Sequence, residues 1–473
     1  MIMVNLVLFD AGLMGYSLAV HILLVTVGMT LPIIMSIAEF VSIKYKVKIY
    51  DVLAKRLANA LIIFFAVGTA SGVVVAIELF VLWPKFISVL GQVGILPLYM
   101  EIFAFFTEAI FLGIYIYFWN KFKSRIRHWL LSIFIAIGAV MSGVFITMIN
   151  AFMNTPKGFN IPYYLSTGKI IDVNPFAVLN TPTTWMEIGH VIGSTIFAGA
   201  AFFLAYFAYK LLKTKGIERE YYKKAAKIAA AIVIIAIILT VIIGIESITN
   251  LMVYQPEKFA ALEMNFNSGP HVAEVIGGFL VNNKTVDSIN IPGLMSFLAT
   301  GSFNGVIASN DSLSAYAKST WPPVTVVHNT FDIMVGLGVL IGIIMVIFLI
   351  VWLLNVNKIR DRFESNKFFK KLLSRKIFSD PFDNPLVLKV LIIIGVLAAF
   401  LLEDGWVTDE VGRQPWIIYN VMTVSAAANT SPSVLPVGIA MIAFYVVVLP
   451  ATVLFVRNVM KKRDLNKELG VKP

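Results

Sequence analysis

Nine long apolar runs constrain this chain more than any other feature of its sequence. Each is about as long as the roughly 20 residues that a helix needs to cross a bilayer. Because backbone groups inside lipid must be hydrogen-bonded within the protein, isolated spans of this length have to be helical. We therefore predict an all-α, polytopic membrane bundle of nine transmembrane helices, with the two termini on opposite sides. The runs cover 14–40, 57–83, 97–120, 128–153, 184–212, 223–250, 326–356, 386–405 and 434–457.

Composition supports a protein surrounded by lipid and limits its metal chemistry. Hydrophobic residues make up 59% of the chain and charged residues 14%, and the mean hydropathy is +0.85. The chain has no cysteine, which excludes disulfides, iron–sulfur clusters, thiolate-bound zinc and thioether-linked haem. Any redox metal must then be held by His, Met or carboxylate. The first run has neither a basic segment before it nor a clear cleavage site after it, so we expect a retained helix.

The basic residues alternate between the two sides of the predicted bundle. Of the 38 Lys and Arg residues, 30 lie in five connections on one side, whereas the other side holds seven. Basic connections stay in the cytoplasm, which predicts an outside N-terminus, a cytoplasmic C-terminus and a multi-pass protein of the cell membrane. The net charge of +11 then reflects topology and contact with anionic lipid, and we expect no nucleic-acid partner. The five basic segments are 41–56, 121–127, 210–227, 358–376 and 457–473, of which 358–376 is expected to form a solvated helix.

One connection is far longer than the others. Residues 251–325 join the sixth and seventh runs on the predicted outer side, and loops of this length are uncommon unless they have a function. We therefore divide the chain into helices 1–6 (residues 1–250), an outer loop (251–325) and helices 7–9 (326–473).

Two histidines fall inside the predicted membrane helices. His21 and His190 each lie about two turns into an inward-running helix, which places both in the outer half of the bilayer. A single His at such a position often only hydrogen-bonds a neighbouring helix. Two histidines at the same depth in the bilayer, in a chain without cysteine thiols, favour haem ligation. His128 stands beside Arg125 and Arg127 and is expected at the inner interface.

Carboxylates also occur at membrane depth. Glu101 and Glu108 are seven residues apart in the third run, so they share a helix face about 10 Å apart along the axis. Ser142 and Asn150 on the fourth run and Glu78 on the second add polar groups. Such a pattern is typical either of a proton relay or of hydrogen bonds between helices.

The stretch EDGWVTDEVGRQPW, residues 403–416, concentrates four carboxylates and Arg413 where the eighth run ends. It is either an ordinary polar helix end or a binding site, because ionisable groups at this depth need partners. Gly-Arg-Gln-Pro-Trp, with Glu410 two residues before its Gly, resembles the signature of subunit I of cytochrome bd-type quinol oxidases. The resemblance implies that Glu410 ligates a high-spin haem.

The same resemblance implies the other iron ligands. His190 and Met334 match the pair that holds the low-spin haem b, and Gly336 and Gly338 would let a macrocycle approach the helix of Met334. His21 would hold a second high-spin haem, so that the high-spin pair is either b and d or b only. In some relatives an Arg stands at the position of Asp332 in this chain.

Two further residues of the 403–416 stretch receive roles from the family. Trp406 would pass electrons between haems. Arg413 would offset a haem propionate or the carboxylate of Glu410.

A second motif opens the outer loop. Gln255-Pro256-Glu257-Lys258-Phe259-Ala260-Ala261-Leu262-Glu263 resembles the start of the family's quinol-binding loop. There Lys258 would orient the quinol oxygen and Glu263 would accept a proton. Glu246, just before this loop, is a secondary candidate for quinol contact.

The resemblance implies an electrogenic oxidase. Quinol would be oxidised at the outer face and oxygen reduced to water, with protons taken from the cytoplasm along Glu108, Glu101 and Ser142. The implied partners are a second membrane subunit (subunit II), a small single-helix subunit, quinol, oxygen and the lipid bilayer. Two alternatives stay open. One is a haem b protein that carries electrons from quinol without reducing oxygen, and the other is a haem-free transporter that uses Glu101, Glu108 and Glu410 as ion or proton sites.

Overall fold

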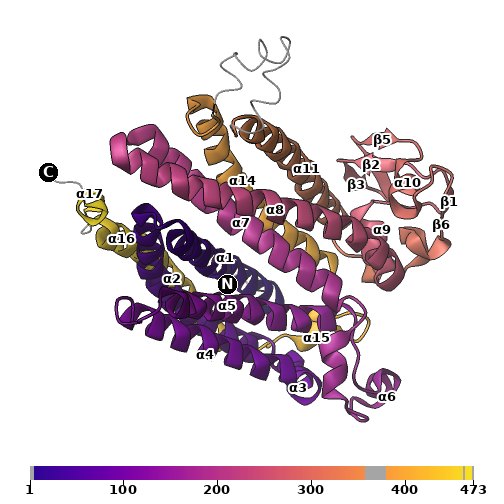
Figure 1. Ribbon diagram of the computed structural model, residues 1–473. Helices are drawn as coiled ribbons and strands as arrows, with labels where there is room; N and C mark the ends of the chain where they lie inside the picture. Colours follow the sequence, from indigo (N-terminus) through magenta and orange to yellow (C-terminus); the bar gives the residue numbers. More distant parts are fainter. Residues whose placement is uncertain (1–4, 357–379, 462–463, 471–473) are drawn as a thin grey trace, which may run out of the picture.

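All nine predicted spans are helices in the computed structural model, which describes residues 5–356, 380–461 and 464–470 (Figure 1). Within these residues nine helices are long and apolar enough to cross a membrane. The basic segment 358–376 lies outside the described residues, so its helix is still a prediction. The nine are α1 (Leu6–Tyr45), α2 (Lys48–Leu82), α4 (Ile95–Tyr117), α5 (Arg125–Asn154), α7 (Thr184–Lys213), α8 (Gly216–Tyr254), α11 (Val324–Leu354), α14 (Pro385–Gly412) and α16 (Val434–Lys461).

Two helix boundaries differ from the predicted ones in ways that matter for the site. α1 begins at Leu6, where the Asn5 side chain caps the helix, and it carries the fully buried Asp10 inside its second turn. His21 therefore lies 15 residues after the helix start, about four turns, and its predicted position of two turns is wrong. α14 continues to Gly412, so Glu410 belongs to its last turn.

Glycines let neighbouring helices approach closely. A side chain at Gly138 of α5 would meet the backbone nitrogen of Glu108 in α4 at 2.7 Å, and one at Gly395 of α14 would meet the carbonyl of Ala201 in α7 at 2.7 Å. Close backbone contact of this kind stabilises helix pairs in lipid, where the hydrophobic effect is weak. By these and similar contacts α1 packs on α2, α5 and α7, α7 packs on α8 and α14, and α11 packs on α14 and α8.

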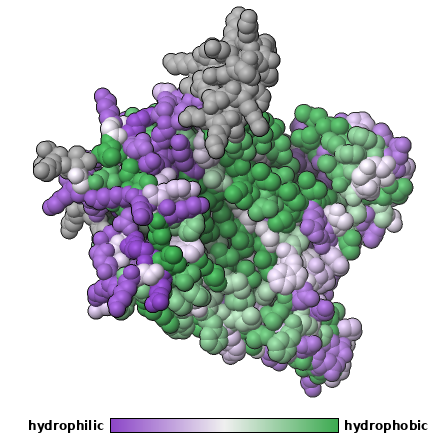
Figure 2. Space-filling model, in the orientation of Figure 1, coloured by the Kyte–Doolittle hydropathy of each residue, from purple (hydrophilic) through white to green (hydrophobic). Residues whose placement is uncertain are grey.

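The surface matches a membrane environment. In Figure 2 a broad hydrophobic face covers the middle of the bundle, and hydrophilic side chains gather toward its ends. Many large apolar side chains on these helices are exposed, among them Phe103 at 75% and Phe80 at 66%. A chain with the described helices and this apolar belt is a multi-pass membrane protein.

Short elements cover the two ends of the bundle (Figure 1). The end opposite α17 carries α3 (Pro84–Val93), α6 (Ile161–Thr167), a 3-10 helix (Pro175–Asn180), α15 (Val424–Ala427) and the paired strands β7 (Trp416–Ile418) and β8 (Met422–Thr423). At the other end, α17 (Leu465–Leu469) is joined to α2 by the Arg56–Glu468 ion pair of 2.7 Å.

The long connection between α8 and α11 is folded. Its helix α9 packs against α8, α11 and α14. The hairpin of β3 and β4 turns at Asn282 and Asn283, whose φ angles of 51° and 60° are those of a type I′ turn. The connection contains α9 (Pro256–Leu262), α10 (Leu294–Thr300), three 3-10 turns (Ser309–Asp311, Leu313–Ala315, Lys318–Thr320) and three antiparallel strand pairs: β1 (Gly269–Pro270) with β6 (Val306–Ile307), β2 (Glu274–Ile276) with β5 (Ile289–Ile291), and β3 (Phe279–Val281) with β4 (Lys284–Val286).

Candidate functional site

Glu410 lies at the partly exposed edge of a polar network that joins the end of α14 to α5. Its Oε1 accepts a hydrogen bond of 3.1 Å from Nδ2 of Asn150, and its Oε2 forms an ion pair with Arg413. Arg413 is 2% exposed and also donates to Oδ1 of Asn154 at 2.9 Å. Arg413 and Glu410, which the sequence analysis named as candidate site residues, therefore form a direct ion pair.

Asn154 carries the network on to α7 and α9. Its Nδ2 donates to Asn150 at 2.7 Å and to Oε1 of Glu187 at 3.1 Å, while its Oδ1 accepts from Arg413 and from Gln255 at 3.2 Å. An amide has two donor hydrogens and two acceptor lone pairs. Every one of them is used here, which fixes the orientation of Asn154.

Glu187 was missed by the sequence reasoning. It lies one helical turn before His190 on α7, so the spacing Glu-x-x-His was the available signal. The structure shows that this turn connects the surroundings of His190 to those of Glu410.

Lys258 is buried rather than displayed on the outer loop. Its side chain is 3% exposed, and its Nζ forms an ion pair with Oδ1 of Asp409 and donates to the backbone carbonyl of Asp409 at 3.0 Å. Asp409 also accepts from Asn150 at 3.2 Å. The predicted quinol residue and the residue next to Glu410 therefore belong to one network.

His190 packs against α8. The nearest point is Gly244, where an added Cβ would lie 3.4 Å from Cε1 of His190. Its Nδ1 is buried and has no hydrogen-bond partner among the described residues. A buried ring nitrogen without a partner is unusual, and a ligand or cofactor bound at that nitrogen would satisfy it.

Met334 packs against α14. An added Cβ on Gly405 would lie 3.2 Å from the sulfur of Met334, so the thioether faces the helix that carries Glu410 five residues later. Because α7 and α11 both pack on α14, the structure brings the predicted pair His190 and Met334 into one group of helices.

His21 is oriented by α2. Its Nδ1 is 2.8 Å from Oγ of Ser71, and that hydroxyl also donates to the carbonyl of Gly68 at 2.8 Å. With its one hydrogen committed to Gly68, Ser71 can only accept from the imidazole. Nδ1 of His21 is then the protonated nitrogen, which leaves Nε2 with a free lone pair for a metal.

Within the described residues no group of three or more His, Asp or Glu side chains could hold a bare metal ion.

The two predicted membrane carboxylates are both found on the face of α4 that packs on α5. Ser142 of α5 donates a 2.7 Å hydrogen bond to Oε1 of Glu101. Glu108 is 8% exposed and lies against Gly138. Trp406 is half-buried and packs against the largest apolar core.

Glu263 and Glu246 have opposite environments. Glu263 is 5% exposed, whereas Glu246 lies exposed on α8. Burial, together with the charge of nearby Glu274, raises the pKa of the Glu263 carboxyl well above its usual range. One carboxyl oxygen of Glu263 and one of Glu274 have no hydrogen-bond partner among the described residues. Glu263 therefore has the character of a proton acceptor.

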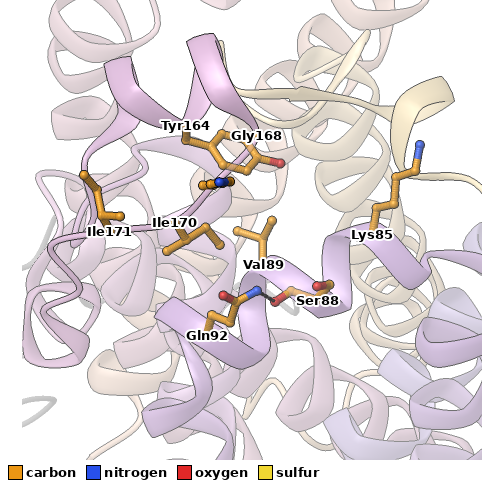
Figure 3. Close-up of a pocket in the computed structure, with 9 residues that line it drawn as sticks. Lys85, Ser88, Val89, Gln92, Tyr164, Gly168, Ile170 and Ile171 are labelled. Atoms are coloured by element: carbon orange, nitrogen blue, oxygen red, sulfur yellow. Dashed lines mark hydrogen bonds between the residues drawn. The ribbon is translucent and has the colours of Figure 1, made fainter.

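Two pockets at the surface of the described residues are lined by residues other than the predicted haem ligands. The larger, of about 610 Å³, lies between α3 and the segment that follows α6, and Lys85 and Tyr164 are among its lining residues (Figure 3). The second, of about 360 Å³, reaches Asn154 and is lined by Tyr254 and Tyr419. It meets the buried network from the end of the bundle that carries α15.

Comparison with known proteins gives consistent matches over almost the whole chain. The sequence profile of the family "Cytochrome bd terminal oxidase subunit I" matches residues 12–464. The chain is 34% identical over 466 residues to a putative cytochrome bd menaquinol oxidase subunit I of Bacillus subtilis (strain 168), covering 97% of each protein. It is 30% identical to cytochrome bd ubiquinol oxidase subunit 1 of the same organism, covering 93% of this chain and 91% of the relative. Among solved structures, bd oxidase from Geobacillus thermodenitrificans superposes with a TM-score of 0.84 at 31% identity, covering 97% of this chain and 99% of that one.

Proposed function

This chain belongs to the cytochrome bd terminal oxidase subunit I family, and from that membership we propose how its residues divide the work of a quinol oxidase. It is a haem-containing, multi-pass subunit of the plasma membrane that works with a subunit II. Quinol would be oxidised at the outer face, and two high-spin haems, one of type b and the other d or b, would supply the chemistry that reduces oxygen to water. The Lys and Arg distribution supports the orientation, with the N-terminus outside and the C-terminus in the cytoplasm.

His190 and Met334 hold the low-spin haem b in this proposal. Two observations support the fit: Nδ1 of His190 is buried without a partner, and the sulfur of Met334 faces the backbone of Gly405. Gly336 and Gly338, on the helix of Met334, have no other atoms within 4 Å of an added Cβ. These positions would therefore leave room for a macrocycle to approach this helix.

His21 and Glu410 hold the two high-spin haems. The acceptor Oγ of Ser71 keeps the proton of His21 on Nδ1, and Arg413 and Asn150 bind and orient the carboxyl group of Glu410. When bound, haem supplies one-electron transfer and oxygen chemistry, which no side chain of this chain provides.

Two buried donors beside Glu410 also fit this cofactor. Nε of Arg413 and Nε1 of Trp416 are buried and have no partner among the described residues. Both are donors only, so an anionic group such as a haem propionate would satisfy them. Trp406, packed at the same end of α14, is the residue that we assign to electron passage.

Glu263 accepts a quinol proton, with Lys258 in a supporting role. The raised pKa of Glu263 makes this carboxyl a better proton acceptor than an exposed glutamate. Lys258 is committed to Asp409, so contact with quinol would require that ion pair to open. Glu246, exposed on α8, is the secondary candidate for contact at the rim.

Protons for oxygen reduction move along Glu108 and Glu101. Ser142 binds Glu101 and connects α4 to α5, whose Asn150 reaches Glu410. The polar groups therefore lie on adjoining helices between the predicted inner side and the site of Glu410.

The observation that carries this proposal is the polar network around Glu410. It is tested by Glu410→Gln, which removes an anionic iron ligand but keeps a side chain that can bind Asn150. A reduced-minus-oxidised optical spectrum of the purified oxidase should lose one high-spin haem signal and keep the low-spin signal. The matched control is Glu220→Gln, because Glu220 is an exposed α8 residue paired only with Lys224 at 3.0 Å.

The same spectrum separates the two alternative functions. An unchanged haem complement in Glu410→Gln would contradict the assignment of this acid. A flat visible spectrum of the wild-type protein would leave a haem-free transporter, and haem bands without quinol-driven oxygen uptake would leave an electron-transfer protein.

A further inference from the structure

Tyr115 continues the line of Glu101 and Glu108 toward the predicted cytoplasmic end of α4. The three residues are spaced seven apart, so they lie on one face of the helix at intervals of about 10 Å. Tyr115 is fully buried and lies two residues before the end of α4. A proton route through Glu108 needs an entrance at this end, and Tyr115 is positioned to provide it.

The hydroxyl of Tyr115 donates to a buried carboxylate of α1. It binds Oε2 of Glu39 at 2.7 Å, and Glu39 has no exposed surface. The other oxygen of Glu39, Oε1, is 2.6 Å from Nδ1 of His128, which is also fully buried. The His128 ring, which was predicted at the inner interface beside Arg125 and Arg127, is enclosed by α4 and α1 rather than exposed there.

The geometry around His128 requires a shared proton. Its Nε2 lies 2.9 Å from the carbonyl oxygen of Tyr115, and a carbonyl only accepts, so Nε2 carries a hydrogen. The contact between Nδ1 and Glu39 then needs a second hydrogen, which lies either on His128 or on Glu39. A proton held between two buried side chains at 2.6 Å is the geometry that a proton-loading site needs.

This pair is connected to the surface. Arg125 of α5 approaches Oε1 of Glu39 at 3.3 Å and also pairs with Asp51 of α2. The side chains of Arg125 and Asp51 are each 36% exposed, so they reach water at the end of the bundle predicted to face the cytoplasm. The charged and titratable groups that face Glu39 are thus Arg125, His128 and Tyr115, with Asp51 behind Arg125.

We propose that Glu39 and His128 form the proton-loading site at the inner entrance of the route to Glu108, with the Tyr115 hydroxyl as the outward relay. This inference rests on the function proposed above. A proton from cytoplasmic water is taken up by the Glu39–His128 pair, Tyr115 passes its hydroxyl proton outward, and Glu39 returns a proton to Tyr115. Water molecules bridge the roughly 10 Å of axial distance from Tyr115 to Glu108.

The test uses the complete oxidase, with its partner subunit, reconstituted in vesicles with the cytoplasmic face accessible. Glu39→Gln and Tyr115→Phe should each slow quinol-driven oxygen uptake about tenfold, within the usual range for a lost proton-transfer group. Their haem spectra should equal that of the wild type, and acidifying the cytoplasmic side should restore part of the rate. Tyr221→Phe, which alters a buried tyrosine of α8 far along the chain from this site, is the matched control and should retain the wild-type rate and pH profile.

Three outcomes would overturn the proposal. One is a wild-type rate in Tyr115→Phe while Glu108→Gln is slow. The second is a slow rate whose pH profile is unchanged, since that is the result of a purely structural role. The third is a loss of haem signal in Tyr115→Phe. This variant removes only a single hydroxyl, so it still tests the proposal if Glu39→Gln fails to fold. Failure of the proposed function itself is distinguishable, because it would appear as an unchanged haem complement in Glu410→Gln.

Discussion

Lys258 and Asp409, 151 residues apart in the sequence, form a buried ion pair next to Glu410. The pair ties α9, the first element of the outer segment, to the last turn of α14. A side chain at Gly412 would meet Cε of Lys258 at 2.9 Å, so glycine there makes room for the lysine. Any movement of the outer segment is thereby coupled mechanically and electrostatically to the surroundings of Glu410.

Replacing Lys258 by Met should destabilise the protein by about 2 kcal/mol, because Asp409 loses its main counter-charge while staying largely enclosed. A matched double variant, Lys258→Met with Asp409→Asn, should recover most of that loss, since neither charge is left alone. Thermal unfolding of the purified oxidase measures both. The quinol KM should recover in the double variant as well, and a KM that stays high would show that Lys258 contacts quinol directly.

A larger residue at Gly244 should displace His190. A Cβ there already lies 3.4 Å from the imidazole, so Gly244→Ala should be tolerated, whereas Gly244→Val should weaken the low-spin haem signal selectively. Optical spectroscopy of reduced protein checks this result. Gly113→Val, at an α4 position with no atoms within 4 Å of an added Cβ, is the control, and an equal loss there would mean that the effect is general misfolding.

Ser71→Ala should impair the high-spin haem assigned to His21. Without the Ser71 acceptor, Nδ1 of His21 loses the partner that fixes the tautomer, and loss of such a partner typically weakens a metal site about 10- to 100-fold. Haem content per protein and the high-spin signal are the measurements. In Ser194→Ala, where the hydroxyl only binds a carbonyl of its own helix at 3.1 Å, both should equal the wild type.

The pH dependence of stability should change in Glu263→Gln. Burial and the charge of Glu274 raise the pKa of Glu263 in the folded state. The contribution of this carboxyl to folding stability is therefore fully present below its pKa in the unfolded chain, about 4.3. That contribution is lost as pH rises through the folded-state pKa. The wild type should therefore lose stability over this window, and the Gln variant should lose less. Unfolding midpoints between about pH 5 and 8 measure the slope. Glu246→Gln, at an exposed site, should keep the wild-type slope, and identical slopes in all three proteins would contradict the assignment.

The sequence alone determined the nine helices, because a membrane span is recognised from the apolar length of one continuous segment. It also determined, through the Gly-Arg-Gln-Pro-Trp motif, which residues to consider as iron ligands. All nine spans were confirmed. Their predicted boundaries were wrong where a helix includes polar residues, such as Asp10, that the prediction had placed outside it.

The partners of those residues were decided only by the tertiary structure. The bonds of Asp409 with Lys258, of His21 with Ser71 and of His128 with Glu39 each join helices that are distant in the chain. Their formation depends on how the helices rotate and approach one another, which is set by packing at small residues such as Gly138 and Gly395. Hydropathy gives the length of a membrane helix. It says little about how the helix is rotated about its axis, because lipid and protein interior are almost equally apolar.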